Sequence, residues 1–148
     1  MTTAVKYIDS PVIIEHFKSF YRDLMSPSFV KLEDIYDNDL IFIDPIHQIN
    51  GLAEVANYTD TLCDNLTECR FEYLDEMISY NSAYIKWNMH YRHPKLGDKL
   101  HTLRGVSHIC FDKKITYHED CYDVGAMVYE HLPIIGALTR MVKSRLTA

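Results

Sequence analysis

The second half of the chain alternates apolar and polar side chains with a period of two, and this feature constrains the fold more than any other. The pattern covers four long segments, at about 68–80, 83–93, 100–111 and 114–123. Successive side chains of a strand point to opposite faces, so each segment predicts a strand with one buried face. Short polar turns separate the segments, and we therefore expect the strands to pair as an antiparallel meander.

The first half of the chain instead repeats apolar residues at helical spacing. Ser10 followed by Pro11 is typical of a helix start. The pattern then predicts, in order, a helix to about Met25, a short helix over 26–35 that the polar turn 37–39 ends, a buried strand over 40–43, and a third helix after Gly51. Helices followed by a long antiparallel sheet make an α+β fold.

Length and composition limit the classes of partner. A chain of 148 residues is the size of one domain, so we expect a single domain over residues 1–148. A net charge of -6 disfavours nucleic acid, and no stretch approaches the roughly 18 apolar residues that a membrane span needs. The N-terminus does not resemble a signal peptide, which favours a cytoplasmic protein. The four cysteines form no CxxC pair and are expected to be reduced core residues.

Three stretches of the chain resemble a known family. FIDPIHQINGLAEVANYTDTL has the order strand, Asp-Pro, loop, Gly and helix that is typical of the nuclear-transport-factor-2-like superfamily. LRGVSHICFDKKITYHEDCYDVG and YEHLPIIGALTRMVKSRL resemble its SnoaL-like branch, which is named for a polyketide cyclase. The resemblance implies a cone in which N-terminal helices pack in a strongly curved antiparallel sheet, with a C-terminal helical tail. It also implies a deep pocket and a homodimer through the outer face of the sheet.

The Asp-Pro pair also resembles the ketosteroid isomerases of this superfamily. Asp44 matches the position of their proton-shuttling carboxylate. Phe17 stands where the resemblance places their oxyanion tyrosine, and Ser107 where it places their protonated aspartic acid. Steroid isomerisation by that mechanism is therefore disfavoured. Tyr21, one helical turn after Phe17, is an alternative source of a hydroxyl on the same face.

The last predicted hairpin brings together the residues with the best candidate chemistry. A two-residue loop at 112–113 would place Ser107 opposite His118 and Gly105 opposite Asp120. His118 and Asp120 are two positions apart on one strand, so their side chains share a face. An imidazole beside a carboxylate is a workable general acid and base near neutral pH. The alternative is structural, with Asp120 only satisfying a hydrogen bond of His118.

The same strands are expected to form a pocket wall. Gly105 has no side chain and would leave room for a ligand atom beside Asp120. Trp87 and Met89 share the apolar face of their strand and should line the pocket, although core packing alone explains the same pattern. The candidate catalytic residues are Asp44, His118 and Asp120, and the candidate ligand-binding residues are Phe17, Tyr21, Trp87, Met89, Ser107 and Tyr122.

Helical patterns continue beyond the last predicted strand. Residues 126–131 predict a helix that Pro133 and Gly136 interrupt, and an amphipathic segment follows from Leu138 to Leu146. Basic residues in this segment suggest a membrane surface, but the segment is short and weakly basic. We expect it instead to pack across the mouth of the pocket.

These residues support hypotheses of different classes. The first is an enzyme without cofactor that moves protons during isomerisation, cyclisation or dehydration of a mostly apolar organic compound. The second is a ligand-binding or protein-interaction module without catalysis, because one fold serves many roles. A hydrolase that activates water is a third, but the Arg and Asp arrangement it needs is not evident. No metal site is expected, because the eight histidines form neither HxH nor HExxH, and His90 and His93 would point to opposite faces of a strand.

Overall fold

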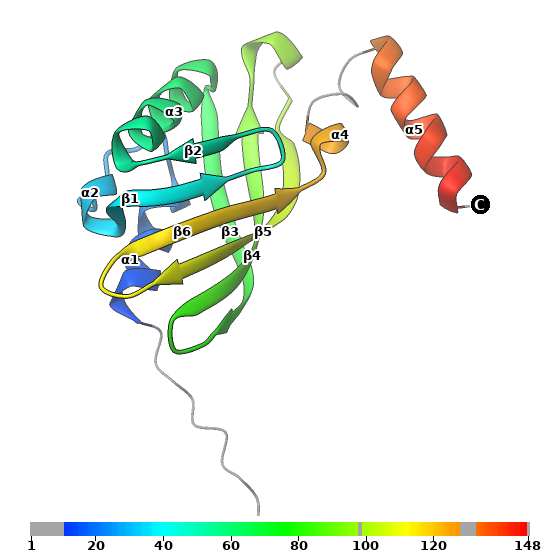
Figure 1. Ribbon diagram of the computed structural model, residues 1–148. Coiled ribbons are helices and arrows are strands. Elements are labelled where there is room, and N and C mark those ends of the chain that lie inside the picture. Colours follow the sequence, from blue (N-terminus) through cyan, green and yellow to red (C-terminus); the bar gives the residue numbers. More distant parts are fainter. Residues whose placement is uncertain (1–10, 98, 128–132, 148) are drawn as a thin grey trace, which may run out of the picture.

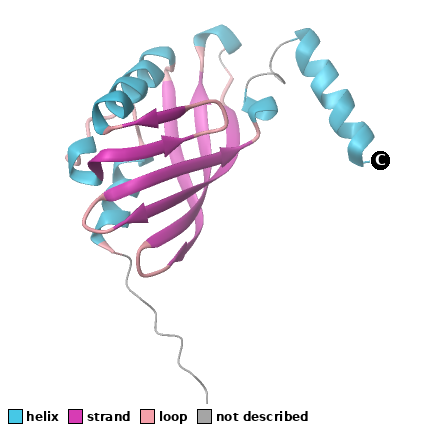
Figure 2. Cartoon of the chain, viewed as in Figure 1, coloured by secondary structure: helices cyan, strands magenta, loops and turns pink. Residues whose placement is uncertain are grey.

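A curved six-stranded sheet dominates the computed structural model, which describes residues 11–97, 99–127 and 133–147 (Figure 1). The strand order is β2-β1-β6-β5-β4-β3. The sheet is not closed, and its helices are the α part of the predicted α+β fold (Figure 2). The strands are β1 (Tyr36–Ile43), β2 (Gln48–Asn50), β3 (Glu68–Ile78), β4 (Ser82–Arg92), β5 (His101–Phe111) and β6 (Ile115–Tyr122). The helices are α1 (Val12–Arg22), α2 (Leu32–Ile35), α3 (Leu52–Asn65), the short 3-10 helix η1 (Pro94–Leu96), α4 (Val124–Met127) and α5 (Pro133–Thr147).

The antiparallel meander predicted from the period of two is confirmed. β3 pairs with β4, β4 with β5, and β5 with β6, each in the antiparallel direction. Along β4 the burial alternates without a break, so Ala83, Ile85, Trp87, Met89 and Tyr91 all face the interior. One face of each strand is therefore available to build the core and any cavity.

The first strand differs from its prediction in length and in partner. The polar triplet 37–39 does not end a helix, because Tyr36 and Leu40 on either side of it are buried in the strand β1. Its polar residues occupy an irregular, more exposed stretch of the pairing with β6. β2, which pairs with the end of β1, was not predicted.

One pair of strands is parallel, so the sheet is mixed rather than wholly antiparallel. β1 lies parallel to β6, with Phe42 opposite His118 and Ile43 opposite Glu119. Parallel strands end at the same edge of a sheet. This arrangement brings Asp44, just after β1, to the same end of the sheet as Asp120 near the end of β6.

The predicted register of the last hairpin is wrong by two residues. Ser107 lies opposite Asp120 and Gly105 lies opposite Tyr122, whereas the two-residue loop placed Ser107 opposite His118. Phe111 pairs with Ile115, so the turn has three residues, and the register shifts between Cys110 and Phe111. A shift of two residues keeps every side chain on its face. His118 and Asp120 therefore still point inward, with different neighbours.

The N-terminal helices pack on the sheet, and α1 ends earlier than expected. α1 contacts β3, and α3 contacts β1. The chain turns at Asp23, whose carboxylate accepts hydrogen bonds from the Met25 N–H and the Ser26 hydroxyl. α2 has only four residues rather than ten. Ser10 of the predicted helix start lies outside the described residues.

The C-terminal helix α5 does not meet two of its expectations. Gly136 lies within α5 and does not interrupt it, while residues 128–131 of the preceding predicted helix are outside the described part of the chain. The apolar residues Leu138, Met141, Val142 and Leu146 are exposed, and α5 extends away from the sheet (Figure 1). Packing across the pocket mouth is therefore wrong for the side chains described in α5. None of the described helices has the length and apolar character needed to cross a membrane.

The cysteines are free but only one of them is a core residue. Cys69 is buried in β3, whereas Cys63 and Cys110 are half-buried and Cys121 is exposed. Cys121 follows Asp120 in β6, so the alternation of the strand turns its side chain to the outer face.

Candidate functional site

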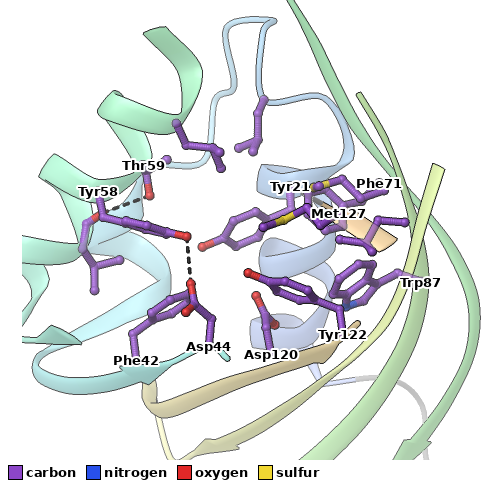
Figure 3. Close-up of a pocket in the computed structure, with 15 residues that line it drawn as sticks. Tyr21, Phe42, Asp44, Tyr58, Thr59, Phe71, Trp87, Asp120, Tyr122 and Met127 are labelled. Carbon is purple, nitrogen blue, oxygen red and sulfur yellow. Dashed lines mark hydrogen bonds between the residues drawn. The ribbon is translucent and has the colours of Figure 1, made fainter. Parts of the chain in front are cut away.

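A cavity of about 70 Å³ opens between the helices and the inner face of the sheet (Figure 3). Its walls come from α1, α3 and α4 and from five of the six strands or their ends. Most of the lining is apolar, and its few polar groups are hydroxyls and carboxylates. Such a cavity, with a few polar groups converging on it, is typical of small-molecule sites.

The candidate residues divide between this cavity and a deeper one. Six of them line the larger cavity, namely Tyr21, Asp44, Trp87, Met89, Asp120 and Tyr122. The other three, Phe17, Ser107 and His118, lie beyond it around a second cavity of about 10 Å³. Tyr21, Phe71, Trp87 and Asp120 line both spaces, so these four residues form the boundary between them.

Asp120 has one oxygen that two side chains hold and one oxygen with no hydrogen-bond partner among the described residues. Its Oδ1 accepts a hydrogen bond from the Ser107 hydroxyl at 2.5 Å and contacts His118 Nε2 at 2.7 Å. No described residue makes a hydrogen bond to Oδ2 of this side chain, and the Asp120 carboxylate lines the larger cavity (Figure 3). A carboxylate only accepts hydrogen bonds, so His118 carries a proton on Nε2. The arrangement fixes the orientation of Asp120 and leaves a basic oxygen on a carboxylate that lines the cavity.

A buried row of hydroxyls continues from the other side of the imidazole. His118 Nδ1 lies 2.6 Å from the Tyr36 hydroxyl, which lies 2.6 Å from the Tyr21 hydroxyl. Burial raises the pKa of Tyr36 well above its ordinary value, and the neighbouring Tyr21 raises it further. Burial likewise raises the pKa of Tyr21, so both hydroxyls are neutral at physiological pH. The row joins α1 and β1 to β6 and reaches the larger cavity at Tyr21.

Trp87 supports Asp120 through Ser107. The indole Nε1 donates to the Ser107 hydroxyl at 2.8 Å, and that hydroxyl donates to Asp120. The indole also occupies the space above Gly105, where an added Cβ would lie 2.3 Å from the ring atom Cη2. The expectation that Gly105 leaves room for a ligand beside Asp120 is therefore wrong, because the indole ring takes that room.

Asp44 is more fully hydrogen-bonded than Asp120. Its Oδ1 accepts from the backbone N–H groups of Ile46 and His47, at 2.8 and 2.6 Å. Its Oδ2 accepts from the Tyr58 hydroxyl at 2.8 Å, and His47 Nδ1 lies 3.1 Å from both oxygens. Burial on its own would raise the pKa of Asp44, but these hydrogen bonds together outweigh it and lower the pKa. Asp44 is therefore a carboxylate at neutral pH.

Three tyrosine hydroxyls converge on the cavity between the two carboxylates. Figure 3 shows the hydroxyls of Tyr21, Tyr58 and Tyr122 directed at its centre, with Asp44 and Asp120 below them. Burial raises the pKa of Tyr122, and the charges of Asp44 and Asp120 add to the rise. Tyr122 thus remains a neutral hydroxyl that can donate a hydrogen bond into the cavity.

Sequence reasoning missed Tyr36 and Tyr58. Tyr36 stood between a predicted helix and a predicted turn, where no strand face could be assigned to it. Tyr58 had a readable signal, since it follows Val55 by three residues and precedes Leu62 by four, which is the spacing of one helix face. All three of these α3 residues line the cavity.

The described histidines outside this site do not gather around a common point. His90 bonds through Nδ1 to the Thr102 hydroxyl, and His93 Nδ1 accepts from the Lys95 N–H. Within the described ranges, no three His, Cys, Asp or Glu side chains are placed to hold a metal ion.

Comparison with known proteins identifies the family. The profile of the SnoaL-like domain matches residues 17–118, which is more than half of the chain. No curated protein matches the sequence.

Solved structures agree with this match at the level of the fold. A candidate SnoaL-like polyketide cyclase from Jannaschia sp. CCS1 has a TM-score of 0.69 and 7% identity, over 81% of this chain and 93% of that one. A second candidate from Shewanella denitrificans OS-217 has a TM-score of 0.66 and 18% identity, over 80% and 95% of the two chains. A protein of ketosteroid isomerase-like fold from Catenulispora acidiphila DSM 44928, in complex with trimethylamine, has a TM-score of 0.67 and 9% identity, over 80% and 90%. The chain therefore belongs to the SnoaL-like domain family and has the nuclear-transport-factor-2-like fold.

Proposed function

We propose that this protein is an acid–base enzyme that acts without a cofactor on a small, mostly apolar organic compound. The observation that carries the proposal is the carboxylate of Asp120, which lines the cavity and has Oδ1 held by Ser107 and His118, while no described residue bonds to Oδ2. A base held in one orientation beside an apolar cavity is suited to removing a proton from carbon. The reaction class is an isomerisation, cyclisation or dehydration.

In this proposal each polar group has a distinct role. Asp120 accepts the proton, and the electron pair of the broken C–H bond moves onto the oxygen of an adjacent carbonyl group. Tyr122, with its neutral hydroxyl in the cavity, donates a hydrogen bond to that oxygen. His118 is a positioning residue, because it contacts Asp120 without lining the larger cavity. Asp44 keeps its charge and its hydrogen bonds, so it orients the ligand rather than exchanging protons.

The names of similar structures agree with this reaction class. Two of them are candidate polyketide cyclases, and cyclisation is one of the proton-transfer reactions proposed for this chain. The third contains a small organic molecule, trimethylamine. At identities of 7% to 18%, these structures share the fold with this chain, and its own residues must carry the chemistry.

The second candidate is a binding module of the same fold. The hydrogen-bonded state of Asp44 favours it, because a carboxylate that already accepts from Tyr58 and two N–H groups is built to stay charged. Such a module would bind ligand in the same cavity without breaking a C–H bond. The two candidates therefore differ in proton exchange and not in binding.

Deuterium exchange distinguishes the two candidates. We expect the protein to speed the exchange of the α-protons of small ketones, such as cyclohexanone, with deuterium oxide, as followed by proton NMR. Asp120→Asn keeps an oxygen that accepts from Ser107 and removes the base, so exchange should slow by about a hundredfold or more. The control is Asp112→Asn in the exposed hairpin turn, which should exchange at the wild-type rate. Equal rates in all three proteins would rule out Asp120 as the base, and binding without exchange would favour the module.

We also propose that the chain forms a homodimer through the outer face of the sheet. Tyr84 of β4 is 50% exposed there and stacks on His108, with ring centroids 4.3 Å apart. Met77 of the neighbouring strand is 74% exposed, and large exposed apolar groups on a sheet favour association. We expect light scattering at low micromolar concentration to give about twice the mass of one chain.

The matched variants test whether this face is the interface. Tyr84→Asp should shift the measured mass toward one chain. Tyr80→Asp should leave the mass unchanged, because Tyr80 is exposed at the turn between β3 and β4, away from the middle of the sheet. A monomeric wild-type protein at these concentrations would contradict the dimer.

A further inference from the structure

The described residues give the larger cavity negative charges and no positive ones. Asp44 and Asp120 both line it, and none of the described side chains that line it is a lysine, an arginine or a histidine. The histidines that contact the two carboxylates, His47 and His118, lie behind them and are not part of the lining. A buried carboxylate is stabilised by a cationic partner, and the part of the chain that the structure describes places none inside the cavity.

Aromatic rings surround the same space. Six of the lining residues are aromatic, namely Tyr21, Phe42, Tyr58, Phe71, Trp87 and Tyr122. They form neighbouring pairs, with ring centroids 5.5 Å apart for Phe42 and Tyr58, 5.1 Å for Phe71 and Trp87, and 6.5 Å for Trp87 and Tyr122. The face of an aromatic ring attracts a cation, and the attraction is strongest when the cation has lost its water.

The charge and the walls together select one class of ligand. A metal ion would need several oxygen or nitrogen ligands close together, and no such group of three occurs among the residues that the structure describes. An alkylated ammonium ion instead needs apolar walls for its carbon atoms and nearby negative charge for its nitrogen. The cavity of about 70 Å³ has room for several groups of the size of water or methyl.

We propose that the cavity binds a small organic ammonium ion, with its alkyl groups against the aromatic rings and its charge balanced by Asp44 and Asp120. This inference rests on the proposed function, because it specifies the substrate of the same site as a compound that carries a protonated or quaternary amine. Transfer of a carbon-bound proton from such a compound to Asp120 neutralises that carboxylate. The ammonium charge then balances the electron pair left on the ligand, so the ligand does not become a net anion. The same step on a neutral ketone would leave a negative oxygen beside the charged Asp44 with no positive charge on the ligand to balance it, which is less favourable.

The negative charges of the two carboxylates also affect the pKa values of the tyrosine hydroxyls in the cavity. Burial raises the pKa of Tyr58, and the charge of Asp44 and its hydrogen bond raise it further. The same two carboxylates contribute to the raised pKa of Tyr122. Groups on two walls of the cavity thus resist becoming negative, as expected where negative charge already accumulates.

A pair of ligands that differ only in charge tests the inference on the wild-type protein. Choline carries a trimethylammonium group, and 3,3-dimethyl-1-butanol has the same shape with carbon in place of nitrogen. Titration calorimetry should show choline binding about tenfold tighter or more, with sodium chloride added to keep the ionic strength equal in both titrations. Asp120→Asn should reduce the preference for choline, and the exposed-site control Asp112→Asn should preserve it.

The choline titration tests the ammonium inference, and the deuterium-exchange measurement tests the proposed function. Equal or tighter binding of the neutral alcohol, or no binding of choline, would overturn the ammonium inference. Deuterium exchange into neutral ketones tests Asp120 as a base whether or not choline binds. A protein that exchanges ketone protons without preferring choline would keep the proposed function and lose this inference. A protein that prefers choline and exchanges no proton would be a binding module for ammonium ions.

Discussion

Gly105→Ala is expected to destabilise the protein by about 3 kcal/mol, a large effect for one methyl group. The added Cβ would lie 2.3, 2.5 and 2.8 Å from three atoms of the Trp87 ring, closer than any real contact allows. The indole is buried and holds Ser107 by a hydrogen bond, so it cannot move without breaking its link to Asp120. Backbone strain plays no part, since Gly105 is not among the glycines with positive φ. Urea unfolding of wild type and variant measures the loss.

A second substitution shows whether the indole causes this loss. Trp87→Leu removes the ring atoms that the new Cβ would meet, and it lowers the free energy of unfolding by itself. Gly105→Ala should therefore be much less harmful in the Trp87→Leu background than in wild type, and the double-mutant cycle measures the difference. Additive effects of the two changes would contradict the contact as the cause.

His118→Leu is expected to lower the free energy of unfolding by about 3–5 kcal/mol. His118 is 2% exposed and bonds to Asp120 and Tyr36, and its ring also packs edge-on against Phe17 and Phe42. Leucine fills part of the same space but leaves Asp120 with Ser107 as its one remaining hydrogen-bond partner among the described residues. A partly buried charge that loses a hydrogen-bond donor is costly, whereas the lost ring contacts are a smaller term.

The control for this change lies on the opposite face of the sheet. His108→Leu alters a histidine that stacks on Tyr84 at the outer surface, and it should change stability by less than about 1 kcal/mol. Adding Asp120→Asn to His118→Leu should recover part of the loss, because the charge is then gone. If His118→Leu unfolds at the same urea concentration as His108→Leu, the row of hydrogen bonds does not stabilise the fold.

The sequence pattern predicted the elements well wherever the alternation was long. The strands β3, β4, β5 and β6 carry enough period-two repeats to place their bounds within about two residues, whereas the polar triplet inside β1 interrupts its pattern. The short elements were missed or misjudged for the same reason. β2 has three residues and α2 has four, too few to show any period. The polar triplet 37–39 suggested a turn because a local pattern does not reveal that Tyr36 and Leu40 are buried by distant strands.

The candidate site was predictable as a face but not as a set of contacts. The period-two alternation correctly predicted that His118 and Asp120 lie on the inner face of the sheet. A register shift near Cys110 places Ser107 opposite Asp120. No residue type in the turn indicates this shift in the sequence. The space above Gly105 was filled by Trp87 of the adjacent strand, because an absent side chain is as available to a neighbour as to a ligand. The parallel pairing of β1 and β6 brings Tyr36 into the site, and local sequence patterns cannot show this pairing.

That parallel pairing also sets the order in which the protein can be completed during synthesis. β1 and β6 are separated by roughly half of the chain, so their contact is among the most distant in sequence that the fold contains. While the ribosome has made β1 but not β6, Asp44 exists without Asp120 and the cavity lacks one wall. Nascent chains released before about residue 122 would therefore carry no complete site, and ligand present in the cell could stabilise only molecules whose translation has passed β6.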